Sequence, residues 1–217
     1  MKRFAALMLA LALAALIGRG FAGAQDATPA AGATPSGFFG FPDPSECTVA
    51  PKSIGELQSI LATPVAATPA AATPTASPVT TAMPAGTPAD ATTVAEVQAT
   101  LRETVACINT GQILKVVQFY SDDLLRSIIA GYPLEQLQQG TPVAGTPVPL
   151  PQAQQTELIG ISGMVVTPDG RVAVVVTGDN HAEPSPPSDT LFYFVKVGDK
   201  WLVDDFVTDV NVATPAP

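Results

Sequence analysis

Residues 190–207 read TLFYFVKVGDKWLVDDFV and contain the clearest pair of β-strands in the chain. Aromatic and β-branched residues, which favour strands, lie on both sides of a turn at Gly198-Asp199. Because side chains alternate along a strand, both faces of residues 191–197 are largely apolar. Either a highly curved sheet or a self-associating outer face would account for this pattern, and the sequence leaves both open.

Two further strands are predicted before this hairpin, at residues 157–166 and 171–177. They flank residues 167–170, TPDG, a turn with Pro in second and Gly in fourth position. A proline-rich loop over residues 183–188 leads on to the hairpin. The four strands together predict an antiparallel meander.

Helical patterns precede the strands. Thr93 and Glu96 form a capping-box pair, and apolar residues then repeat at helical spacing until Gly111. Ser121 is the expected cap of a later helix, and Pro133 is suited to begin a short one. We therefore predict an α+β fold with N-terminal helices on one face of a curved antiparallel sheet of about four strands.

This domain is expected to cover residues 91–213, with residues 214–217 as a short tail. A region of this length is large enough for one hydrophobic core. Residues 46–61 are predicted to form a short helical clasp that begins with the capping pair Ser53 and Glu56.

The regions before and after the clasp are poor in residues that build a core. Residues 25–45 are expected to be disordered, and residues 62–90 to form a Pro/Thr/Ala-rich linker in which prolines oppose helix and sheet. The phenylalanines at positions 38, 39 and 41 form either a patch for a partner or one that docks on the domain itself. Composition alone does not establish glycosylation of the linker's hydroxyl groups.

The first 24 residues have the plan of a secretory signal peptide. Lys2 and Arg3 precede an uncharged apolar run over residues 4–17, and Ala22-Gly23-Ala24 fits a cleavage site after Ala24. The run is shorter than the roughly 20 residues that span a bilayer. The sequence therefore predicts a secreted or cell-surface protein without a membrane span in the mature chain, with a retained N-terminal anchor as the alternative.

Cys47 and Cys107 are the two cysteines of the chain. In an exported protein, an even number of cysteines favours a disulfide. A metal pair or a redox pair fits poorly, because the two lie 60 residues apart and no histidines cluster near them. We therefore expect a Cys47–Cys107 disulfide and no metal site.

The net charge of −9 argues against nucleic acid as a partner. Removal of the signal peptide takes away three cations and no acids, which leaves −12. No Lys/Arg cluster in the mature chain offsets this charge locally.

Few residues are candidates for chemistry. Asp122-Asp123 and Asp204-Asp205 are the acidic pairs near element ends, and a general base in a pocket would come from Asp122, Asp123 or Asp205. The structural alternative places the first pair at a helix start, where the helix dipole favours acids, and at least one of the second pair in water. His181, the sole histidine, has Asp179 or Glu183 as a potential partner, or is a polar loop residue. No phosphate loop or other cofactor motif is present, so no cofactor is expected.

The helical start and the end of the sheet together resemble the nuclear-transport-factor-2-like superfamily, also called SnoaL-like. The similar features are the long helix followed by Asn109 and Gly111, the segment FYSDD at residues 119–123, and the closing strand in GDKWLVDDF. The resemblance covers about 115 of 217 residues and implies a cone-shaped cavity between helices and sheet. No catalytic residue of the family's isomerases and cyclases maps onto this sequence.

We therefore expect non-catalytic binding of a small apolar ligand or a protein partner, while the sequence leaves enzyme activity undecided. Two alternatives remain: a structural domain that forms a homodimer through its sheet face, and an isomerase or cyclase that uses a pocket Asp.

Overall fold

The computed structural model describes residues 39–63, 83–139, 148–182, 186–208 and 210. The predicted signal peptide, the tail and most of the predicted linker lie outside these residues. In chain order the elements are η1 (Pro44–Glu46), α2 (Ile54–Ala62), β1 (Thr87–Pro88), α3 (Ala91–Ile108), α4 (Ile113–Val116), η2 (Val117–Phe119), α5 (Asp122–Ile129), α6 (Leu134–Gln139), η3 (Gln152–Gln154), β2 (Thr156–Val166), β3 (Val172–Asn180), β4 (Ser188–Val197) and β5 (Lys200–Val207).

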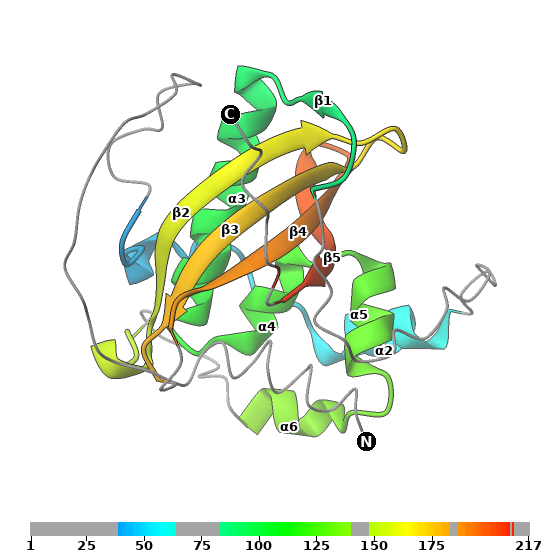
Figure 1. Cartoon of the computed structure of the whole chain (residues 1–217). Coiled ribbons are helices and arrows are strands. Elements are labelled where there is room, and N and C mark those ends of the chain that lie inside the picture. Colours follow the sequence, from blue (N-terminus) through cyan, green and yellow to red (C-terminus); the bar gives the residue numbers. More distant parts are fainter. Residues whose placement is uncertain (1–38, 64–82, 140–147, 183–185, 209, 211–217) are drawn as a thin grey trace.

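The fold is α+β, with one open antiparallel sheet in the order β1-β2-β3-β4-β5. The four long strands are those predicted, and Gly198, with φ 63°, occupies the turn of the β4–β5 hairpin. Figure 1 shows these strands curving side by side across α3. Bulges interrupt the register between β2 and β3 and between β4 and β5. Since a bulge bends its strand, these irregularities contribute to the curvature.

The two-residue strand β1 corrects the prediction that the proline-rich region before residue 91 excludes sheet structure. Thr87 and Pro88 pair with Val166 and Val165 at the edge of β2. A proline is tolerated there, because an edge strand needs to donate hydrogen bonds on one side only. Gly86 precedes the pair, and a Cβ atom at this position would lie 2.5 Å from the carbonyl oxygen of Val166. Only glycine therefore fits this approach to the sheet.

Helix α3 begins earlier than the sequence indicates. Asp90 is its N-cap and accepts a 2.8 Å hydrogen bond from the Thr93 backbone N–H, so Thr93 lies inside the first turn. Glu96 does not complete a capping box, because its carboxylate accepts hydrogen bonds from Lys196 and Trp201 of the β4–β5 hairpin. The tertiary contact replaces the local one.

Both faces of the sheet are covered. The helix-facing side packs on α3 around a core cluster that consists of Val97, Leu101, Val105, Leu124, Leu158, Val172, Val174, Val176, Phe194, Trp201 and Val203. On the opposite side, Ala173, Val175 and Leu191 are buried, with Val210 and Met83 of the same chain packed against them. This answers the question raised by the two apolar faces of β4: the sheet is curved, and adjoining segments cover part of its outer face.

The segment over residues 39–45 is ordered, whereas residues 25–45 were expected to lack fixed structure. Gly40 exchanges two backbone hydrogen bonds with Leu158, with N···O distances of 2.7 and 2.9 Å, and Phe41 stacks on His181 with ring centroids 5.0 Å apart. The patch at Phe41 therefore docks on its own domain, and Phe38 lies outside the described residues. Hydrogen bonding to the edge of β2 fixes a segment that is too poor in core residues to fold alone.

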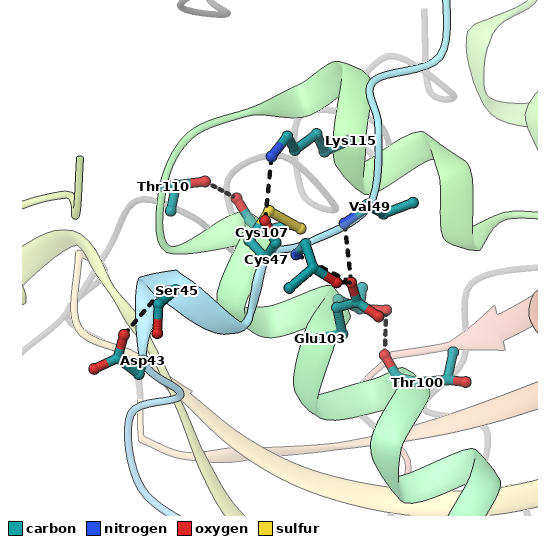
Figure 2. Close-up of a disulfide and its surroundings, with 11 residues drawn as sticks. Asp43, Ser45, Cys47, Val49, Thr100, Glu103, Cys107, Thr110 and Lys115 are labelled. Atoms are coloured by element: carbon teal, nitrogen blue, oxygen red, sulfur yellow. Dashed lines mark hydrogen bonds between the residues drawn. A yellow bond between two sulfur atoms is a disulfide. The ribbon is translucent and has the colours of Figure 1, made fainter. Parts of the chain in front are cut away.

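The helical clasp is attached as predicted. A disulfide joins Cys47 to Cys107 near the end of α3 (Figure 2). Helix α2 has the expected Ser53–Glu56 capping box, and its Leu57 is fully buried among residues of α4, α5 and α6. No helix in the described part of the chain is long and apolar enough to cross a membrane.

Candidate ligand cavity

A cavity lies between the second half of α3 and the end of the sheet where β2 and β4 begin and β3 and β5 end. It is lined by Leu101, Thr104, Val105, Ile108, Tyr120, Thr156, Leu158, Val176, Gly178, Ser188, Thr190, Phe192, Val203, Phe206 and Thr208. Its volume is about 80 Å³. An apolar cavity of roughly 150 Å³ binds benzene, so this one accommodates a smaller molecule or one end of a larger molecule.

Among the described residues, no charged side chain lines this cavity. Its polar lining consists of hydroxyl groups and backbone, and the remaining lining side chains are apolar. The hydroxyl of Thr104 is already used, because it donates a 2.7 Å hydrogen bond to the carbonyl oxygen of Thr100 one helical turn earlier. An ion in such a site would lose its hydration without gaining a partner, which is costly. The cavity therefore suits a neutral, largely apolar molecule.

Tyr120 reaches the cavity through backbone contacts with β5. The residue forms an isolated parallel bridge with Val203, and the next backbone N–H, that of Ser121, donates to the Val203 carbonyl oxygen at 2.8 Å. The Ser121 side chain then caps α5, as predicted. This attachment holds the Tyr120 ring where three hydrophobic clusters meet. They are the sheet core described above, an α2–α6 cluster (Leu57, Leu114, Val117, Leu125, Ile129, Leu134 and Leu137) and a disulfide cluster (Cys47, Ala106, Cys107, Val116 and Phe119).

Asn109 anchors the end of α3 to the start of β2, next to the cavity. Its side-chain amide donates to the Thr156 carbonyl oxygen at 2.9 Å and accepts from the Thr156 N–H at 2.7 Å. Asn109 is completely buried, and Gly111 follows with φ 67°. These two residues turn the chain out of α3 and have a structural role.

The first acidic pair lies away from the cavity. Asp122 and Asp123 occupy the first turn of α5, and Asp123 pairs with Arg126 of the same helix. This is the structural alternative, in which the helix dipole stabilises acidic residues at a helix start. Neither residue contributes to the lining.

The second acidic pair also lies outside the cavity. Val203 and Phe206 both pack on the helix-facing core, and the bulge in β5 places Asp204 and Asp205 between them. Asp204 pairs with Arg171 at 3.4 Å, while Asp205 stands opposite Tyr193. Partial burial of the carboxyl raises the pKa of Asp205, although the residue as a whole is exposed. The strict alternation assumed from the sequence fails here, because a bulge adds one residue to the strand.

His181 has a partner that the sequence did not indicate. Its Nε2 lies 3.1 Å from Oε2 of Glu157, whereas Asp179 and Glu183 were the expected partners; Glu183 lies outside the described residues. Glu157 and Asp179 are cross-strand neighbours, and burial raises the pKa of Asp179, while His181 opposes the shift. The group lies near the Phe41 docking site and does not line the cavity.

The surroundings of the disulfide hold the clasp with directed hydrogen bonds (Figure 2). Oε1 of Glu103 accepts from the backbone N–H groups of Thr48 and Val49 at 3.1 and 3.0 Å, and the Lys115 ammonium donates to the Cys47 carbonyl oxygen at 3.1 Å. Both cysteines are buried, at 2% and 0% exposure. The disulfide is therefore part of the framework behind the cavity.

A second hollow of about 420 Å³ lies between α3 and the β4–β5 turn. Its lining mixes polar and apolar groups, and Glu96 there is engaged by Lys196 and Trp201 at 2.7 and 2.8 Å. These hydrogen bonds lower the pKa of Glu96. Glu96 is committed to the hairpin, and Glu103, also in the lining, to the backbone of Thr48 and Val49, so this hollow is a weaker candidate for a ligand than the apolar cavity.

Within the described residues, no group of three or more His, Cys, Asp or Glu side chains is arranged to hold a metal ion. Comparisons with family models, curated proteins and solved structures give no significant match to this chain. Tyr120 is a cavity-lining residue that the sequence did not single out as a candidate; its aromatic ring directly before the capping Ser121 was the available signal.

Proposed function

We propose that this protein is a secreted domain that binds a small, neutral, largely apolar molecule in the cavity between α3 and the sheet. The observation that carries the proposal is a concave apolar site whose lining, in the part of the chain that the structure describes, carries no charge. We further propose that the domain is nuclear-transport-factor-2-like. Support comes from the order of its elements, in which helices precede a curved antiparallel meander.

Secretion is proposed from the sequence of residues 1–24 and agrees with the disulfide, since disulfides persist in oxidising compartments. The isomerase or cyclase alternative has less support, because Asp122, Asp123, Asp205 and His181 do not line the cavity. Self-association through the outer sheet face also has less support, because Met83 and Val210 pack against that face.

Filling the cavity tests the proposal. Gly178 lines the cavity, and a Cβ at this position would meet a single neighbour, the Glu157 carbonyl oxygen, at 3.5 Å. Gly178→Val should therefore fold, occupy the site and weaken binding of cyclopentane, a probe about as large as benzene that inserts one end into the site, at least about tenfold. Binding would be followed by chemical-shift changes in nuclear magnetic resonance spectra of the whole secreted chain.

Gly160→Val is the matched control. A Cβ at Gly160 would contact Thr177 at 3.6 to 3.7 Å, and Gly160 does not line the cavity, so cyclopentane binding should be retained. Equal binding by the wild-type and Gly178→Val proteins, or no binding to the wild-type protein, would contradict the proposed function.

A further inference from the structure

The hydroxyl of Tyr120 has no hydrogen-bond partner among the described residues, which is unusual for a phenol inside a protein. The buried side-chain polar atoms that lack a partner there are Arg126 Nε and Asp179 Oδ1. The Tyr120 hydroxyl is not one of them and so retains accessible surface, in line with the half-buried state of the residue as a whole. Since Tyr120 lines the cavity, we place that surface on the cavity side.

The chemical state of this hydroxyl is also defined. Burial raises the pKa of Tyr120 to about 12, so the phenol keeps its proton at any physiological pH. A protonated phenol is a hydrogen-bond donor. An unused donor in apolar surroundings carries a free-energy cost, which an acceptor placed in the cavity would remove.

We propose that the Tyr120 hydroxyl is the polar anchor of the cavity and donates a hydrogen bond to a neutral, largely apolar ligand that carries one acceptor oxygen, such as a carbonyl or an ether. The proposal rests on the ligand-binding function proposed above and defines the chemical class of that ligand. A carboxylate ligand is disfavoured, because no cation among the described residues lines the cavity to compensate its charge.

The test compares cyclopentanone with cyclopentane, two probes of similar size that differ in one acceptor oxygen, on the whole disulfide-bonded chain. Tyr120→Phe removes the hydroxyl and keeps the ring. It should weaken cyclopentanone binding about three- to tenfold, the effect of one neutral hydrogen bond, and leave cyclopentane binding unchanged. Retained cyclopentane binding also shows that the variant is folded.

Tyr193→Phe is the matched control, because Tyr193 packs under Arg171 and does not line the cavity. It should alter the affinity for neither probe. In the wild-type protein, the infrared carbonyl stretch of bound cyclopentanone should lie at lower frequency than that of cyclopentanone in an alkane, which reports the hydrogen bond without any variant.

The outcomes separate the two proposals. Suppose that cyclopentane binds, and that Tyr120→Phe leaves the affinity for cyclopentanone unchanged or lowers the affinity for both probes equally. The proposed anchor role of the Tyr120 hydroxyl is then overturned, while the proposed binding function of the cavity stands. If neither probe binds the wild-type chain, both are overturned.

Discussion

Tyr120 is half-buried and lines the cavity in which we propose that a ligand binds. It is packed by the sheet core, the α2–α6 cluster and the disulfide cluster, yet its hydroxyl has no partner in the described part of the chain. Asn109, at the end of α3, is the opposite case, since its amide both donates to and accepts from the backbone of Thr156. The first arrangement is suited to binding and the second to holding the framework.

The raised pKa of Tyr120 predicts a loss of stability at alkaline pH. The folded-state pKa is about 12, whereas an unfolded tyrosine titrates near 10, so the unfolded chain releases its proton first. The free energy of unfolding should therefore fall as pH rises from about 10 to 12, by roughly 2 kcal/mol from this group. Urea unfolding of the wild-type and Tyr120→Phe proteins at both ends of this pH range measures the contribution of Tyr120. It is the difference between the two proteins in how far the free energy of unfolding falls. Parallel pH profiles would contradict the assignment.

The segment of residues 39–63, which contains the clasp, is held in place by tertiary contacts. Gly40 extends the edge of β2, Glu46 pairs with Arg102 of α3, with 2.7 Å between Oε1 and Nη2, and α2 covers the helical cluster. Lys52 adds a 2.7 Å backbone hydrogen bond to Leu114 in α4. The disulfide is one of several attachments, and it is the covalent one.

Removal of the disulfide should destabilise the protein without changing its fold. Cys47 and Cys107 close a loop of 60 residues, for which the chain-entropy model gives about 4 kcal/mol. The Cys47→Ala/Cys107→Ala variant should show this loss in urea unfolding, and reduction of the wild-type protein should reproduce it. Reductant should have no effect on the double variant. A loss below about 1 kcal/mol would contradict this prediction and would mean that residual structure already restricts the unfolded chain without the disulfide.

At the level of the whole molecule, the folded unit extends beyond residues 91–213. Strand β1 and Met83 precede that range, and residues 39–63 contribute the Gly40 bridge, the Glu46–Arg102 pair and Cys47. These parts cover an edge of the sheet, its outer face and α3. The domain boundary inferred from composition is therefore narrower than the set of residues that pack together.

A chain of residues 91–213 should be less stable than one of residues 39–213. Its melting temperature should also lie several degrees below that of the longer chain with both cysteines replaced by Ala, because the shorter chain loses β1 and the noncovalent clasp contacts as well. Differential scanning calorimetry of the three proteins separates these contributions. Equal melting temperatures for residues 91–213 and the cysteine-free longer chain would show that the clasp acts through the disulfide alone.

The sequence by itself determined the features that depend on neighbouring residues and on composition. The strands on both sides of Gly198, the caps at Ser53 and Ser121, and the pairing of the two cysteines were all predictable. Local propensity, periodicity and the presence of just two cysteines contain this information.

Only the tertiary structure decided which residues surround the cavity and where each acidic group lies. The bulge in β5 places Asp204 and Asp205 outside the helix-facing core. Glu96 accepts a hydrogen bond from Trp201 instead of completing a capping box, and Tyr120 forms a bridge with Val203. Each outcome depends on contacts between residues far apart in the chain. Local patterns carry no information on such contacts, because the free energy of packing is decided by which surfaces meet after the chain has folded.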